Sequence, residues 1–94
     1  MTVANESDVL RVFDDEIDDG SHVLRLEGRI VGPWVDELRR STAFHAGRPA
    51  DLVLDLARVS FLDAAGVALI RDLAGRGVRV VNSSPFVAEQ LRTA

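Results

Sequence analysis

The fold of this chain is limited most strongly by a nearly continuous apolar stretch near its centre. This stretch reads Leu52-Val53-Leu54-Asp55-Leu56. Short apolar runs without strict alternation are typical of strands that are covered on both faces, as in parallel sheets. Because parallel strands need crossover connections, which are usually helices, the sequence predicts an α/β domain built around this central strand.

Two further strands are expected before the central one. Residues 9–13 alternate loosely, and residues 23–27 alternate clearly, with Leu24 and Leu26 on one face. The acidic segment between them ends in Asp19-Gly20, a pair that suits the positive backbone angles of a tight hairpin turn. We therefore expect the domain to begin with two antiparallel strands.

Three helices are predicted from their start and stop signals. Pro33 opens the first, over residues 33–45, because proline is tolerated in the first helical turn. Asp63 can cap the second helix, which Gly75-Arg76-Gly77 ends. Ser84 and Pro85 begin the third helix, with Ser84 as the cap and Pro85 as the first helical residue.

The predicted order of elements is β-β-α-β-α-β-α, with a fourth strand over residues 78–82. We expect one small α/β domain with a mixed sheet over residues 1–94, in which residues 1–8 are only weakly committed to structure. A length of 94 residues suits a single core of this kind.

Composition excludes several classes of function. The formal net charge of -4 has the wrong sign for a surface that tracks phosphates, so we expect no nucleic-acid partner. There is no cysteine, hence no disulfide, thiolate metal site or cysteine nucleophile. No apolar run approaches the ~20 residues that cross a bilayer, and the N-terminus lacks the pattern of a secretory signal. We therefore expect a cytoplasmic chain without membrane insertion.

Motifs for metal, nucleotide or catalytic chemistry are not found. If the acidic segment before Gly20 were a calcium loop, Ile17 and Leu26 would occupy ligand positions, so it fails that test. His22 and His45 lack further ligands at metal-binding spacing, and no serine lies in a glycine-flanked nucleophile turn. The sequence predicts neither an enzyme nor a cofactor.

The candidate functional feature is the turn over residues 59–67, which follows the central strand and leads into the second helix. Open α/β sheets place ligands at the carboxyl ends of their strands. Because this turn offers apolar and small residues rather than convergent polar groups, it suits a protein partner better than a substrate. The simpler alternative is that Asp63 only caps the helix and the small residues only allow close packing. The expected partner-binding residues are Phe61, Leu62, Asp63, Ala64, Ala65, Gly66, Val67 and Ile70.

The same residues resemble the STAS family, named for sulfate transporters and anti-sigma factor antagonists. The similarity runs from the apolar strand ending in Asp55-Leu56, through Asp63-Ala64-Ala65-Gly66-Val67 at a helix start, to the strand and helix that follow Gly77. It covers about nine-tenths of the chain and agrees with the predicted order of elements. The resemblance implies the STAS fold.

The resemblance also implies a function. In anti-sigma factor antagonists, a partner kinase phosphorylates a serine or threonine in this turn, and the added charge weakens the complex. Here Ala64 and Ala65 occupy both candidate positions, and alanine has no hydroxyl to modify. The chain is therefore expected to be a non-catalytic bacterial signalling module in transcription regulation, which binds a kinase-like anti-sigma factor or a related regulator without this switch.

Two alternatives stay open at this point. The STAS subunit of lipid-trafficking ABC transporters has a similar turn, which Ala65-Gly66 matches and Ala64 does not, so docking on a transporter ATPase is the second hypothesis. Many family members continue past the third helix, whereas this sequence stops at Ala94. A sheet edge exposed in this way would allow a homodimer.

Overall fold

The structure is a computed structural model that describes residues 10–16, 21–43 and 48–93. The predicted α/β class and the order β-β-α-β-α-β-α are confirmed within these residues. The predictions for residues 1–8 and for the Asp19-Gly20 turn lie outside them. The elements are β1 (Arg11–Glu16), β2 (His22–Ile30), α1 (Pro33–Ala43), a short 3-10 helix (Pro49–Asp51), β3 (Leu52–Leu62), α2 (Ala64–Gly75), β4 (Arg79–Val81) and α3 (Pro85–Thr93).

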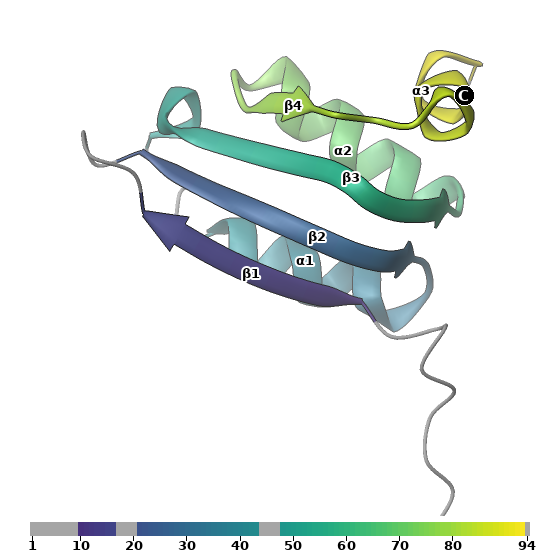
Figure 1. The fold of residues 1–94 in the computed structure, drawn as a ribbon, viewed down its shortest axis with the longest axis horizontal. Helices are drawn as coiled ribbons and strands as arrows, with labels where there is room; N and C mark the ends of the chain where they lie inside the picture. Colours follow the sequence, from purple (N-terminus) through teal and green to yellow (C-terminus); the bar gives the residue numbers. More distant parts are fainter. Residues whose placement is uncertain (1–9, 17–20, 44–47, 94) are drawn as a thin grey trace, which may run out of the picture.

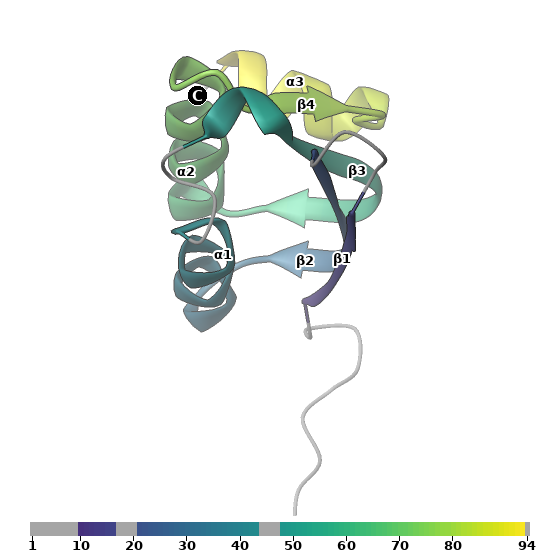
Figure 2. The same ribbon diagram turned by 90° about the vertical axis from the view of Figure 1, so that its left-hand side faces the viewer.

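The described strands form one mixed sheet in the order β1-β2-β3-β4 (Figure 1). β1 pairs antiparallel with β2, whereas β2 with β3 and β3 with β4 pair parallel. α1 and α2 lie side by side on one face of the sheet (Figure 2). α3 packs against β3 and α2. The sheet therefore has a face covered by α1 and α2 and an opposite face that these two helices leave open.

The core lies between the covered face of the sheet and the helices. Alternate residues of β2 and β3 point into the core. Among them, Leu24, Leu26 and Leu54 are at most 1% exposed. From the helices, Leu38, Ile70 and Val87 are equally buried. Val53 and Asp55 alternate with the core leucines and therefore point toward the opposite face. Most of the hydrophobic stabilisation thus comes from one side of the sheet.

β3 is longer than the sequence predicted. Residues 59–62, assigned above to a turn, continue the strand and pair with β2 as far as Leu62 opposite Ile30. The register shifts twice along this pairing; in the first shift β3 advances from Asp55 to Arg58 while β2 advances from Arg25 to Glu27. These bulges break the alternation of apolar residues that would have marked one continuous strand.

Other element boundaries also differ from the prediction. β1 extends through Glu16, because the acidic residues assigned to the turn pair with β2 as far as Glu16 opposite His22. β2 begins at His22 and runs three residues beyond Glu27. β4 contains only Arg79–Val81. The predicted end of α1 at residue 45 lies outside the described residues. Pairing between strands, rather than local propensity, sets the ends of the strands.

Candidate functional site

Asp63 joins the starts of two helices. It is the N-cap of α2, where its Oδ1 accepts a hydrogen bond from the backbone N–H of Gly66 at 2.7 Å. Its Oδ2 accepts a second hydrogen bond from the backbone N–H of Gly32 at 2.8 Å, in the turn before α1. The backbone N–H of Asp63 in turn donates to the carbonyl of Ile30 at 3.2 Å. The predicted capping role is confirmed, and the carboxylate also ties the β2–α1 turn to the β3–α2 turn.

Two glycines make this arrangement feasible. Gly32 has a φ of +54°, in the left-handed region that side chains disfavour, and this conformation lets its N–H point toward Asp63. A Cβ on Gly66 would lie 2.5 Å from the carbonyl oxygen of Ile30, which is closer than atoms can approach. Gly66 therefore allows α2 to cross the end of β2 in direct backbone contact.

The expected partner-binding residues divide into two groups by exposure. Ala64 and Ala65 are exposed on the first turn of α2, and Phe61 and Asp63 are half-buried. Leu62, Gly66, Val67 and Ile70 are buried in the core. The surface that the turn presents to another molecule therefore consists of the exposed and half-buried residues. The four buried residues pack in the core beneath this surface.

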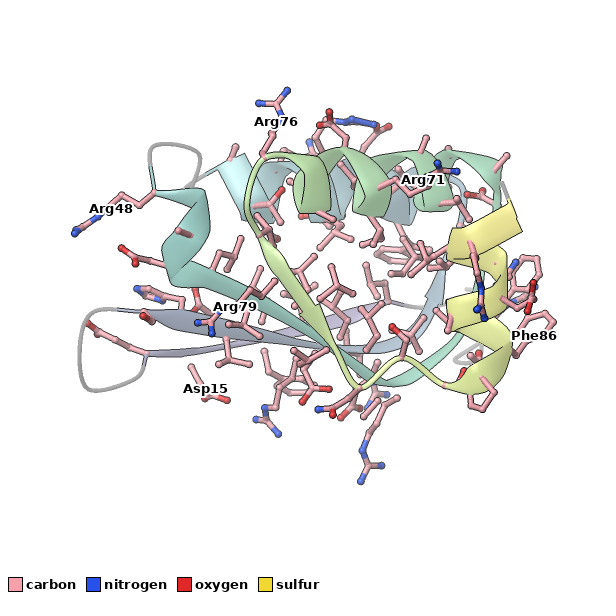
Figure 3. The ribbon with its side chains drawn as sticks, turned by 90° about the horizontal axis from the view of Figure 1, so that it is seen from above. Asp15, Arg48, Arg71, Arg76, Arg79 and Phe86 are labelled. Atoms are coloured by element: carbon pink, nitrogen blue, oxygen red, sulfur yellow. The ribbon has the colours of Figure 1, made fainter. Side chains whose placement is uncertain are left out.

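α3 adds an aromatic cluster to the same end of the sheet. The rings of Phe61 and Phe86 stack with centroids 6.2 Å apart, and the guanidinium of Arg29 lies 5.3 Å from the centre of the Phe61 ring. Phe86 is 56% exposed and points away from the core (Figure 3). The Phe61 side of the turn is therefore flanked by an exposed aromatic ring that sequence reasoning had assigned only to a helix.

Gln90 of α3 fixes the backbone immediately before the turn. Its Oε1 accepts from the N–H of Leu62 at 3.0 Å, and its Nε2 donates to the carbonyl of Leu62 at 2.8 Å. β4 pairs with β3 only as far as Asp55 opposite Val81, so a side chain supplies at Leu62 the two hydrogen bonds that a neighbouring strand supplies elsewhere. The roles of Gln90 and Gly32 could not be predicted from the sequence, because neither lies in a local motif with its partner.

His22 is the titratable group with a clear electrostatic role at the other end of the sheet. Its Nδ1 lies 2.8 Å from Oδ1 of Asp14 across the β1–β2 pair. This hydrogen bond raises the pKa of His22, and the negative charges of Asp14 and Glu16 raise it further, while burial acts in the opposite direction. The pair is an electrostatic link between two strands, far along β2 from the Asp63 turn.

Over residues 10–16, 21–43 and 48–93, no three His, Asp or Glu side chains come close enough to share a metal ion. None of the helices in the described part of the chain has the length and apolar character needed to cross a bilayer.

Comparison with known proteins identifies a family and related folds. The model of the STAS domain family matches residues 12–94. The phosphorylated form of SpoIIAA, a cell fate determinant of Bacillus, superposes with a TM-score of 0.67 at 20% identity, over 87% of this chain and 81% of that chain. The unphosphorylated anti-sigma factor antagonist SpoIIAA gives a TM-score of 0.64 at 20% identity, over 89% and 84% of the two chains.

A third structure extends the comparison to another bacterium. The STAS domain of an anti-sigma-factor antagonist from Rhodobacter sphaeroides gives a TM-score of 0.60 at 18% identity, over 78% of this chain and 86% of that chain. At these identities the likeness shows a shared fold. A search of curated proteins found no match.

Proposed function

Because the chain belongs to the STAS domain family, we propose that it is a non-catalytic protein-interaction module of the anti-sigma factor antagonist type. Its partner is a kinase-like anti-sigma factor or a related regulator, bound through the start of α2. The proposal includes action in the bacterial cytoplasm as a regulator of transcription. A homodimer through a sheet edge stays a prediction.

The observation that carries this proposal is the exposure of Ala64 and Ala65 beside the doubly bonded Asp63. Because the two alanine side chains at the helix start are short, the surface there has little relief. A partner can therefore approach the backbone closely. The hydrogen bonds of Asp63 keep this surface rigid before binding, which lowers the entropic cost of association.

The missing hydroxyl determines how such a complex is regulated. A phosphate would bring a charge of about -1.5 to -2 next to the carboxylate of Asp63, and the two would repel each other. Since neither Ala64 nor Ala65 can be phosphorylated, binding at this surface depends on partner concentration rather than on covalent charge at these positions.

The proposal is tested by affinity purification of the intact chain from its source cells, followed by identification of the retained proteins. Recovery of a histidine-kinase-like ATPase supports the anti-sigma factor assignment. Recovery of a transporter ATPase instead supports the alternative of a transport-complex subunit. Retention of neither class of ATPase contradicts both.

The location of the interface is tested with Ala65→Glu. The new carboxylate lies in the first turn of α2, where it interacts favourably with the helix dipole, so the fold should persist. Its bulk and charge should reduce partner binding by about tenfold or more. The matched control is Ala74→Glu, at an exposed position near the other end of α2. Equal binding by the Ala65→Glu variant and the parent chain would remove this surface from the interface.

A further inference from the structure

The face of the sheet opposite α1 and α2 has the composition of an interface. Figure 1 is viewed toward this face, with α1 and α2 behind the sheet. Strand register and alternation determine which side chains lie on this face. They are Arg11, Phe13, Asp15, Val23, Arg25, Glu27, Val53, Asp55, Arg79 and Val81, and Arg58 joins them because it pairs with Glu27. We call this set the open face. Arginine and aromatic residues are enriched at protein interfaces relative to other surfaces.

The charge of the open face is opposite in sign to that of the whole chain. With Arg29 at its end, it carries five arginines against three carboxylates, a net charge of +2, on a chain whose formal net charge is -4. Figure 3 shows Asp15 on this side of the sheet, whereas Arg71 and Arg76 lie with α2 on the other. Such a local excess attracts partners of opposite charge.

Two stacked arginine–phenylalanine pairs lie along the face. The guanidinium of Arg25 lies 5.3 Å from the centre of the Phe13 ring, as Arg29 does from Phe61. Stacking uses the flat side of a guanidinium and leaves its N–H groups for hydrogen bonds with carboxylates. The Nε of Arg25 already donates to Oδ2 of Asp15 at 2.8 Å. Phe13 is 39% exposed, so the first pair offers an apolar and a cationic group together.

Arg58 and Arg79 are weakly engaged within the described residues. The Nε of Arg58 lies 3.9 Å from Oε2 of Glu27, beyond hydrogen-bond distance, and the Arg58 side chain is 77% exposed. Within the part of the chain that the structure describes, the Arg79 guanidinium makes no ion pair or hydrogen bond. Both cations can therefore pair with a partner at little cost in lost internal bonds.

A hollow lies at the first register shift between β2 and β3. It has a volume of about 170 Å³ and is lined by Arg25, Leu26, Glu27, Asp55, Ala57 and Arg58. The hollow is open to solvent on one side, and its volume has room for one side chain. The stems of Arg25 and Arg58 would contact such a side chain, while their charged ends met carboxylates beside it.

We propose that the open face is a second docking surface, for an acidic protein segment that inserts an apolar side chain between its carboxylates. A second copy of this chain is a poor occupant, because face-to-face pairing would oppose two positive surfaces. Binding of nucleic acid in place of a protein segment is an outcome that the test below distinguishes. This site differs from the surface at Ala64 and Ala65, and Phe61 lies at the border of the two.

The test uses the full chain and a defined probe, a fluorescein-labelled peptide of repeating Glu-Glu-Leu. Anisotropy titration should show saturable binding that weakens as salt is raised. Backbone amide shifts of the isotope-labelled chain should change on β1 to β4, and the Ala65→Glu variant should bind the peptide like the parent chain. Amide shifts confined to the start of α2 would contradict the proposal.

The decisive variant is Arg58→Glu with Arg79→Glu, which should lower the affinity for the peptide by about tenfold or more. The matched control is Arg39→Glu with Arg40→Glu, which changes the net charge equally on α1 and should leave affinity within about twofold. If the first variant folds poorly by circular dichroism, Arg58→Gln with Arg79→Gln should still lower the affinity.

Further outcomes that would overturn the proposal are no saturable binding at millimolar peptide, equal loss in the control variant, equal affinity for a Lys-Lys-Leu peptide, or tighter binding of duplex DNA. A dimer detected by light scattering and abolished by the Arg58 and Arg79 changes would identify a second copy as the occupant instead.

Discussion

The two faces of the sheet are built from the same strands and have opposite properties. On the covered face, Leu24 and Leu54 are at most 1% exposed and pack against helices. On the open face, Arg25 follows Leu24 in the chain and its side chain is 52% exposed. Because successive side chains of a strand point to opposite faces, one strand can contribute to the core on one face and to a binding surface on the other.

The two faces also differ in how much their side chains contribute to the stability of the fold. Complete burial of a leucine contributes about 1.5 to 3 kcal/mol. The ion pair between Arg25 and Asp15 joins two exposed side chains at 2.8 Å, and pairs of this kind contribute roughly 0 to 1 kcal/mol. The open face can therefore exchange its internal pairs for contacts with a partner without endangering the fold.

The largest expected effect comes from comparing one truncation on each face. Leu54→Ala on the covered face should lower the free energy of unfolding by about 2 to 5 kcal/mol, because it leaves a cavity in the core. Phe13→Ala on the open face should cost about 1 kcal/mol, since the ring is partly exposed and loses mainly its stack with Arg25. Urea unfolding measures both. Equal losses would mean that the faces contribute alike to stability.

A smaller effect is expected where α2 meets the end of β2. Gly66→Ala should lower the free energy of unfolding by about 1 to 3 kcal/mol, because the added methyl group would overlap the carbonyl of Ile30. The matched control is Gly75→Ala, where the added carbon meets nothing within 4 Å; this change should be neutral or stabilise by up to about 1 kcal/mol. Thermal unfolding of the two variants distinguishes them. A Gly66→Ala variant as stable as the control would show that the contact can relax.

The smallest effect concerns His22, at the margin of the covered face. Because the hydrogen bond to Asp14 raises the pKa of His22, its contribution to stability is complete below the unfolded value near 6.5 and is lost as pH rises through the higher folded value. Asp14→Asn should shift the pKa of His22 downward. NMR titration of its ring protons measures the shift, and an unchanged titration would exclude Asp14 as its main cause.

Much of the fold follows from short-range signals in the sequence. Asp63 accepts from the N–H of Gly66, three residues away, and Ser84 accepts from the N–H of Val87 at the same spacing. Helix caps of this kind depend on neighbours in the chain, and for this reason both helix starts were predicted correctly. The alternation of Leu24 and Leu26 likewise predicted which side of β2 is buried.

The construction of the candidate turn did not follow from the sequence, and its role as a binding site stays a prediction. Sequence reasoning identified the Asp63 turn, and the exposure of Ala64 and Ala65 is compatible with that interpretation. It treated Leu62 and Ile70 as surface residues, although both are 1% exposed. A single helix pattern indicates which residues are apolar, whereas burial depends on what packs against each of them.

The set of elements follows from the sequence alone, because caps, proline starts and alternation act over a few residues. Only the tertiary structure decided how these elements are fastened: Asp63 with Gly32 across 31 positions, Gln90 with Leu62 across 28, and β3 with β2 beyond Leu56. Such pairs carry no local signature, since a hydrogen bond between distant residues depends on the packing that brings them together. The same packing places α1 and α2 on one face of the sheet only. The arginines of the opposite face are therefore exposed.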